Sequence, residues 1–440
     1  MRVRFAPTPS GPLLVNGARV ALANYLFARR YNAPLLIRLD DVDTERCPPA
    51  ISEQLTQDLR WLGIDWDSCI HQSERRPLYD AAIARLQAQQ LLYPCFESEE
   101  ELRAKQEMRR KRNQPLVYDR AMLALTPAQR AAAEAGGKRP YWRLRLSPRE
   151  LRWHDGLLGE RHAKLPAISD PVLVRADGTP MPLLASVVDD IDTGITHIIR
   201  GEENAANTAI QIELFERLTG RPMSVAFAHL PPLPDGARAL PGRRVAGLPI
   251  RQLRSDGIEP AAITVCMAGT NDPRRAPKPL ADLIASFDLE RYAKADFSVA
   301  CVLAANRRAL AGLGFAEVAD RLPPGATERF WLAVRGNLDM LKEARGWWDV
   351  VTGTIVPPVV ENEHDLLTLA AELLPAEPWG DAVWEQWVDA IVEATGRSRA
   401  GVLAPLYLAL TGEDAGPGLA DLLPLLGRAR ALERLRIAAA

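Results

Sequence analysis

The first 39 residues constrain the fold most strongly, because they follow the order strand, loop, helix and strand. Residues 3–5 and 34–39 are short apolar runs of strand length. Between them, residues 6–17 are rich in proline and glycine, and residues 18–31 place apolar side chains at helical spacing. Two strands joined through a helix form a parallel βαβ unit, whose ligands bind at the carboxyl ends of the strands. We therefore expect the loop after the first strand to face a ligand.

The rest of the chain predicts an α/β protein with a split Rossmann-like parallel-sheet domain and a mostly α-helical carboxyl-terminal half. The polar and basic segment 97–138 interrupts the alternation of strand and helix, which indicates an inserted subdomain. Apolar runs return at 171–174, 183–188 and 196–199, and from about residue 310 the pattern is nearly all helical. The expected parts are the split domain (1–93 and 171–235), the inserted subdomain (94–170), a connecting region (236–310) and a helical domain (311–440).

Composition is that of a globular protein. The 440 residues are 47% hydrophobic and 25% charged, enough for two to four domains. No apolar span approaches the roughly 20 residues that cross a bilayer, so we expect a cytoplasmic protein without membrane contact. The 5 cysteines show no C-x-x-C spacing, which favours reduced thiols over disulfides or a closed zinc site. The net charge of -2 neither indicates nor excludes a nucleic-acid partner.

Several motifs occur in a fixed order. They are Arg-Phe-Ala-Pro-Thr-Pro-Ser-Gly at 4–11, Gly-Ala-Arg at 17–19, Arg-Leu-Asp-Asp-Val-Asp-Thr-Glu-Arg at 38–46, His-Gln-Ser-Glu-Arg at 71–75, Val-Asp-Asp at 188–190 and Thr-His-Ile-Ile-Arg-Gly-Glu-Glu at 196–203. Together they resemble the glutamyl-tRNA synthetases, a family of class I aminoacyl-tRNA synthetases, across residues 1 to about 235 and more weakly beyond. The resemblance implies a tRNA partner of the tRNA-Glu kind. It also implies an acceptor-binding-like insert, a stem-contact-like region at 236–310 and an anticodon-binding-like domain at 311–440.

The resemblance assigns an acidic amino acid or a glutamyl group to one crevice. Arg4 and Arg200, each at the end of a strand, are expected to hold its carboxylate, because guanidinium groups bind carboxylates bidentately. The remaining expected contacts are Thr8, Asp40 and Ser186. Asp40 stands where the family has glutamate, so its reach is one methylene shorter. The alternative is a pair of surface arginines bridged to nearby carboxylates such as Asp40, Asp41 or Glu202.

The positions with which the family grips ATP have changed. Leu14 stands where the resemblance expects a histidine that donates to phosphate, and Asn16 stands where it expects a glycine beside Gly17 at a helix start. The lysine-rich mobile loop corresponds to residues 235–244, where Arg243 and Arg244 follow Pro241 and Gly242. We therefore expect ATP-dependent adenylation to be lost, with no tightly bound cofactor. ATP and Mg²⁺ would be needed only if adenylation survives.

The inserted subdomain is expected to bind tRNA and to lack zinc. Its basic side chains include Arg109, Arg110, Lys111 and Arg143. These cations suit tRNA phosphates, and the alternative is a solvated helix face. Cys95 stands in the sequence Tyr-Pro-Cys-Phe-Glu, which lacks the second cysteine of zinc-bearing family members.

Two main hypotheses remain open. The first is a paralogue that binds tRNA and glutamate or a glutamyl group without activating it, with a possible protein partner. The second is an active glutamate-tRNA ligase with rebuilt phosphate contacts, or an enzyme that transfers a glutamyl group from charged tRNA. An unrelated α/β nucleotide-binding enzyme would not explain the order of the motifs. The helical half could bind tRNA or a partner, or serve as a scaffold.

Overall fold

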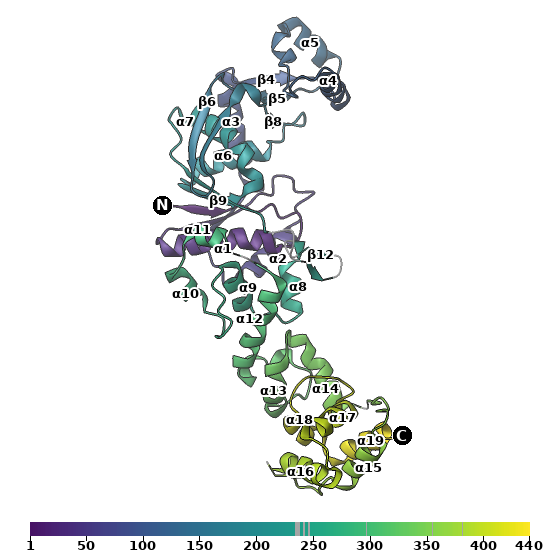
Figure 1. The fold of residues 1–440 in the computed structure, drawn as a ribbon. Coiled ribbons are helices and arrows are strands. Elements are labelled where there is room, and N and C mark those ends of the chain that lie inside the picture. The colour runs from purple at the N-terminus through teal and green to yellow at the C-terminus, as the bar shows by residue number, and fades with distance from the viewer. Residues whose placement is uncertain (234–237, 241–242, 245–246, 296, 354, 381) are drawn as a thin grey trace. The chain divides into compact units, whose positions relative to one another are not determined.

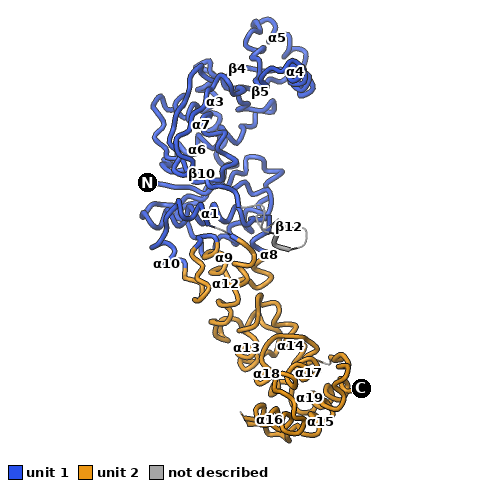
Figure 2. Tube along the Cα trace, viewed as in Figure 1, with its two compact units in different colours: residues 1–251, 267–269, 280–297 blue, residues 252–266, 270–279, 298–440 orange. Residues whose placement is uncertain are grey.

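The computed structural model describes residues 1–440 apart from 234–237, 241–242, 245–246, 296, 354 and 381. The chain divides into two compact units (Figure 2). Unit 1 contains residues 1–251, 267–269 and 280–297, and unit 2 contains residues 252–266, 270–279 and 298–440.

A seven-stranded sheet forms the centre of unit 1, and Figure 1 labels its strands β6 and β9. The order of the strands is β3-β2-β1-β9-β10-β6-β7. Its strands are β1 (Val3–Phe5), β2 (Leu35–Leu39), β3 (Ser68–His71), β6 (Glu150–Asp155), β7 (Gly159–Lys164), β9 (His197–Gly201) and β10 (Ala226–Leu230). Neighbouring strands are parallel except β6 and β7, which form an antiparallel hairpin at one edge. The parallel sheet confirms the α/β prediction.

Helices of unit 1 pack on this sheet and on one another. They are α1 (Val15–Arg30), α2 (Pro49–Trp61), α3 (Arg76–Ala88), α6 (Pro182–Asp192), α7 (Thr208–Thr219), α10 (Leu280–Ala285) and α11 (Leu289–Ala293). The link from β1 through α1 to β2 is the predicted βαβ unit, and α1 buries Ala18, Leu22 and Leu26. The apolar run at 183–188 lies within α6, where Pro182 occupies the first helical turn.

The segment 94–170 contributes to two sheets. The strands β4 (Leu92–Cys95), β5 (Tyr141–Leu144) and β8 (Val172–Val174) form a separate antiparallel sheet. Helices α4 (Glu99–Lys111) and α5 (Pro127–Ala135) lie between β4 and β5 in the chain. In contrast, β6 and β7 extend the large sheet, because β6 pairs with β10.

Downstream, β11 (Arg238–Leu240) and β12 (Arg243–Arg244) form a short antiparallel pair. The expected mobile loop falls partly on residues 234–237 and 241–242, which lie outside the described residues, and the side chains of Arg243 and Arg244 are not described either. The helices α8 (Ile250–Ser255) and α9 (Pro260–Met267) follow.

Unit 2 is helical, which confirms the prediction for the carboxyl-terminal half. Its longer helices are α12 (Val299–Gly312), α13 (Glu328–Val334), α14 (Ala344–Thr352), α15 (His364–Glu372), α16 (Val383–Thr395), α17 (Arg399–Thr411), α18 (Leu419–Leu426) and α19 (Arg428–Ala438). Their core includes Trp331 and Trp387, both fully buried. In the described part of the chain, no helix is long and apolar enough to cross a membrane.

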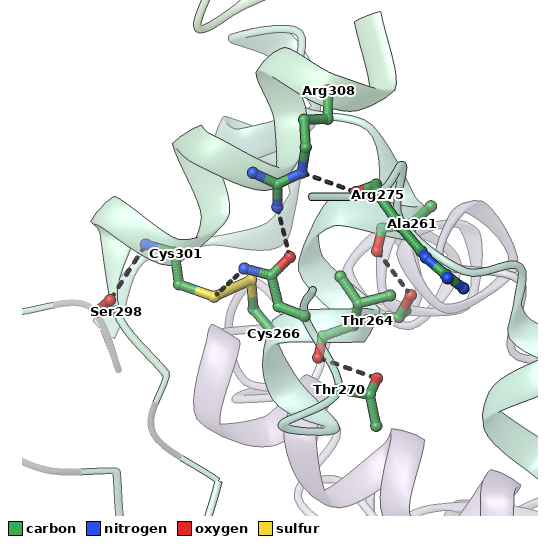
Figure 3. Close-up of a disulfide and its surroundings, with 10 residues drawn as sticks. Ala261, Thr264, Cys266, Thr270, Arg275, Ser298, Cys301 and Arg308 are labelled. Atoms are coloured by element: carbon green, nitrogen blue, oxygen red, sulfur yellow. Dashed lines mark hydrogen bonds between the residues drawn. A yellow bond between two sulfur atoms is a disulfide. The ribbon is translucent and has the colours of Figure 1, made fainter. Parts of the chain in front are cut away.

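Two cysteines of unit 2 form a disulfide (Figure 3). Cys266 lies near the end of α9 and Cys301 in the first turn of α12, with their Cα atoms 6.2 Å apart. Asn271 Nδ2 donates a hydrogen bond to Cys301 Sγ at 3.3 Å. The expectation of reduced thiols is wrong for this pair, because helix packing rather than sequence spacing brings the two sulfurs together. Cys47, Cys69 and Cys95 are free.

Candidate functional site

A cavity of 540 Å³ opens at the carboxyl ends of β1, β2 and β9. Its wall includes the loop after β1, the first turn of α1, the first turns of α6 and the segment that follows β9. Among the residues expected to bind ligand or ATP, eight line it: Arg4, Thr8, Leu14, Asn16, Gly17, Asp40, Ser186 and Arg200. This is the position where ligands bind in open parallel sheets.

Arg4 is neutralised within the protein. Its side chain is buried, and Nε lies 3.2 Å from Asp190 Oδ1 while Nη2 lies 3.5 Å from Asp190 Oδ2. Asp190 is a buried residue of α6. Arg4 therefore forms a buried ion pair with Asp190, which differs from the alternative of surface arginines bridged to Asp40, Asp41 or Glu202.

Arg38 occupies the groups that were expected to hold a ligand. Its Nε donates to Asp40 Oδ1 at 2.7 Å, and its Nη2 donates to Ser186 Oγ at 2.9 Å. Arg38 Nη1 also donates to Asp190 Oδ1 at 2.9 Å. Burial alone would lower the pKa of Arg38, but the carboxylates of Asp40 and Asp190 raise it above its usual value. Asp40 is thus paired with Arg38 while it lines the cavity, and its contact with an amino group stays a prediction.

Arg200 differs from the other two arginines of the cavity. Its Nε donates to His229 Nε2 at 3.0 Å, and its Nη2 donates to Thr208 Oγ1 at 2.9 Å and to the carbonyl of Asn204 at 3.2 Å. No carboxylate of the described residues forms an ion pair with it. Loss of hydration at this partly buried position and the nearby charge of Arg4 lower the pKa of Arg200 to about 9. Arg200 is therefore a cation at neutral pH whose natural partner is an anion in the cavity.

A second polar group in the wall lacks a partner. Gln211, on α7, is buried, and its Oε1 accepts no hydrogen bond from the part of the protein that the structure describes. A buried amide oxygen without a partner is costly.

The ATP side of the cavity is apolar where the resemblance expects a donor. Leu14 is the residue before α1 and remains 39% exposed, and it makes no side-chain cap for the helix. The backbone beside Leu14 is held by a hydrogen bond, because Val15 N donates to the carbonyl of Leu248 at 2.9 Å. The side chain of Asn16 also lines the cavity beside Gly17.

The expected tRNA contacts are divided between a helix end and a half-buried position on a strand. Arg109, Arg110 and Lys111 form the last turn of α4, whose first turn carries three glutamates and is capped by Ser98. Basic residues at a helix carboxyl end also stabilise the helix dipole, so this turn has a structural role besides any contact with phosphate. Arg143 lies apart on β5, with its Cζ atom 4.2 Å from the centre of the Tyr118 ring.

The surroundings of Cys95 contain no metal cluster. Its Sγ lies 3.6 Å from the Tyr118 hydroxyl, which donates to Glu97 Oε2 at 2.6 Å, and Lys105 pairs with Glu97 as well. Burial is the main cause that raises the pKa of Cys95 to about 11, so it stays a thiol. Among the residues that the structure describes, no group of three histidine, cysteine or acidic side chains is arranged to hold a metal ion.

Comparison with known proteins identifies the family. Residues 1–239 match the family described as tRNA synthetases class I (E and Q), catalytic domain. The chain belongs to this family of class I tRNA synthetases. Residues 359–439 match a second description, anticodon binding domain. The resemblance drawn from the ordered motifs is confirmed, and the whole cavity lies in the segment that matches the class I catalytic domain.

Members of the family match over the full length. The chain is 51% identical over 444 residues to Glutamate--tRNA ligase 2 of Gluconacetobacter diazotrophicus, covering 100% of both chains. It is 52% identical over 443 residues to Glutamate--tRNA ligase 2 of Granulibacter bethesdensis, covering 99% of this chain and 98% of that protein. A glutamate tRNA ligase of Elizabethkingia meningosepticum, crystallised with its amino acid, shares the fold with a TM-score of 0.80 at 23% identity, covering 100% of this chain and 99% of that one.

Sequence reasoning missed several residues of the site. Asp190 and Arg38 belong to the motifs at 188–190 and 38–46, but no role was predicted for them from the sequence. In the structure they form the ion pairs of the cavity wall. Asp155 and His229 were not considered, since one fell in the expected insert and the other in a strand. The available signal was the polar His229 inside the otherwise apolar strand β10, which leads directly into Pro231 and Pro232.

Proposed function

We propose that the protein binds a tRNA of the tRNA-Glu kind together with glutamate or a glutamyl group, and that ATP-dependent adenylation is lost. The observation that supports an anionic ligand is Arg200, a cation in the cavity wall that has no carboxylate partner among the described residues. A carboxylate supplied by the ligand would complete its hydrogen bonds and its charge. The neighbouring Arg4 and Arg38 are already paired, so Arg200 is the group that selects for an anion.

The proposed loss of adenylation is supported by Leu14, which lines the same cavity. Leu14 places an apolar side chain where the resemblance expects a phosphate donor, and an apolar group cannot stabilise the charge that develops there. Removing one preorganised donor typically slows a reaction about 10²- to 10³-fold. We expect no tightly bound cofactor and no zinc.

Binding of tRNA is supported by the match of residues 359–439 to an anticodon binding domain and by full-length relatives named as glutamate-tRNA ligases. The basic last turn of α4 adds a local source of positive charge. A cytoplasmic location agrees with such a partner.

An active ligase is the second candidate. The names of relatives that are about half identical over the whole chain favour it. In that case ATP and Mg²⁺ would bind, with Arg243 and Arg244 replacing the lysines of the mobile loop. An enzyme that accepts a glutamyl group from charged tRNA would need only the ligand side of the cavity.

Pyrophosphate exchange separates these candidates. The purified protein is incubated with ATP, labelled pyrophosphate and L-glutamate, with and without tRNA, while calorimetry measures glutamate binding. We expect binding without exchange. Turnover within about tenfold of a few per second would overturn the loss of adenylation. A variant combining Leu14→His and Asn16→Gly is the matched gain-of-function test, and we expect it to raise exchange above that of the unaltered protein.

A further inference from the structure

A chain of hydrogen bonds reaches Arg200 across three neighbouring strands. Asp155 is the last residue of β6, His229 lies on β10 and Arg200 lies on β9, and these strands are adjacent in the sheet. Asp155 Oδ2 lies 2.5 Å from His229 Nδ1, and Arg200 Nε lies 3.0 Å from His229 Nε2. Asp155 and His229 are each 1% exposed, so solvent does not replace either partner.

Asp155 determines which nitrogen of His229 carries the proton. Its Oδ1 accepts hydrogen bonds from the backbone N–H groups of Leu157 at 3.0 Å, Leu158 at 3.0 Å and His229 at 3.2 Å. Burial alone would raise the pKa of Asp155, but the hydrogen bonds from His229 and these backbone groups lower it to about 2. Facing an ionised carboxylate, Nδ1 of His229 is the donor, which leaves Nε2 as an acceptor for Arg200.

The orientation of Arg200 follows from that acceptor. Its Nε is bound by His229, and its Nη2 is bound by Thr208 and Asn204. Nη1 donates to no described residue. With two of three nitrogens fixed, the guanidinium plane is set and Nη1 is left for a ligand.

We propose that His229 and Asp155 are positioning residues that hold the Arg200 guanidinium in the direction required to bind a carboxylate ligand. The proposal rests on the proposed function, in which Arg200 meets glutamate or a glutamyl group. A merely structural network would affect the stability of unit 1 without affecting the choice between an acidic ligand and its neutral amide.

The first test reverses the tautomer. In Asp155→Asn, the three backbone donors at Oδ1 retain the amide oxygen, so the amide nitrogen turns toward His229 Nδ1. That nitrogen then becomes an acceptor, the proton moves to Nε2, and Arg200 loses its partner. We expect ¹⁵N spectra of histidine-labelled protein to show the Nδ1–H form of His229 in the unaltered protein and the Nε2–H form in Asp155→Asn.

The second test separates the two nitrogens of His229. His229→Gln places an amide oxygen near the position of Nε2 and keeps an acceptor for Arg200. His229→Asn keeps a donor near Nδ1 but offers Arg200 nothing. For Asp155→Asn and His229→Asn, we expect the affinity for L-glutamate to fall about 10- to 100-fold, the effect of losing a hydrogen bond to a charged group. Affinity for L-glutamine should fall less, and His229→Gln should remain within about threefold of the unaltered protein.

His154→Gln is the matched control. His154 precedes Asp155 on β6, is exposed and pairs only with the exposed Glu160 among the described residues, so the variant should bind glutamate normally. Thermal unfolding of each variant identifies any that fail to fold. The proposal is overturned if His229→Asn and His229→Gln bind glutamate equally, or if the unaltered protein carries the Nε2–H tautomer. If the unaltered protein binds no glutamate while the tautomers behave as expected, the proposed function fails, and the positioning of Arg200 stands for another anion.

Discussion

The paired charges beneath the cavity make Asp190→Asn the most informative single substitution. Asp190 pairs with Arg4 Nε at 3.2 Å and with Arg38 Nη1 at 2.9 Å, and all three side chains are buried. Among the described residues, Asp190 is the carboxylate paired with Arg4, whereas Arg38 also pairs with Asp40 and Asp189. Replacing Asp190 leaves one buried positive charge without a counterion, which typically costs about 3–5 kcal/mol. Because the amide oxygen of asparagine can still accept a hydrogen bond, we expect Asp190→Asn to lower the free energy of unfolding by about 3 kcal/mol, the lower end of this range.

Asp192→Asn provides the matched control. Asp192 lies two residues further along α6 and pairs with Arg75 at 2.5 Å, but its side chain is half-exposed. A pair of this kind contributes about 0–1 kcal/mol. Both variants make the same chemical change in the same helix. The difference between their effects on stability therefore measures the contribution of burying the ion pair.

Hydrogen exchange followed by mass spectrometry is the appropriate assay, since two compact units need not unfold together. A loss of about 3 kcal/mol in unit 1 corresponds to roughly 100-fold faster exchange in peptides from β1 and β2. We expect this acceleration for Asp190→Asn and less than about fivefold for Asp192→Asn. Equal acceleration in both variants would refute the argument, because it would show that the buried cluster is compensated by water.

Three further predictions follow from other parts of the chain. The pKa of Asp155 is lowered from 3.8 to about 2, which contributes about 2 kcal/mol to the free energy of unfolding above pH 4. This contribution is lost as the pH falls toward 2. Urea titrations should therefore show that Asp155→Asn lowers the free energy of unfolding at pH 7 and lowers it less below pH 4. Alanine at all of 109–111 should weaken tRNA binding and reduce its salt dependence, whereas unchanged affinity and slope would leave this turn only a helix end. The Cys266–Cys301 disulfide closes a loop of 35 residues, and the entropy it removes from the unfolded chain stabilises the fold by about 4 kcal/mol. Cys301→Ala should therefore lower the denaturation midpoint in oxidising buffer. Under reductant, the variant and the unaltered protein should have the same midpoint.

Local patterning was sufficient to predict the first βαβ unit of the sheet. Residues 3–5 and 34–39 alternate with a helical segment, and the structure forms β1, α1 and β2 from them. The hairpin of β6 and β7 was not predicted as part of the large sheet, because its place depends on pairing with β10 some 70 residues later. The disulfide was missed for a similar reason, since Cys266 meets Cys301 only through the packing of their helices.

The sequence predicted which residues line the candidate site, but not which of them form ion pairs with one another. Motifs placed Arg4 and Arg200 in one crevice, and both line the cavity. Which of them is free depends on the rotamers of neighbouring acids, and Asp190 binds Arg4 while no acid binds Arg200 among the described residues. Chain order carries no information on such a choice. His229 was missed for a related reason. Its hydrogen-bond partners lie on the two neighbouring strands, and the sequence does not show which strands are neighbours.

The antiparallel hairpin also affects how the protein behaves at high concentration. An open parallel sheet presents unpaired backbone groups at its last strand, and these can recruit a strand from another molecule. Here the last strand is β7, which pairs with β6 and carries Glu160, Arg161 and Lys164 on largely exposed positions. Charged side chains along such a strand resist the approach of a second copy. Replacing Arg161 and Lys164 by valine should therefore leave the fold intact but make the purified protein form aggregates that light scattering detects.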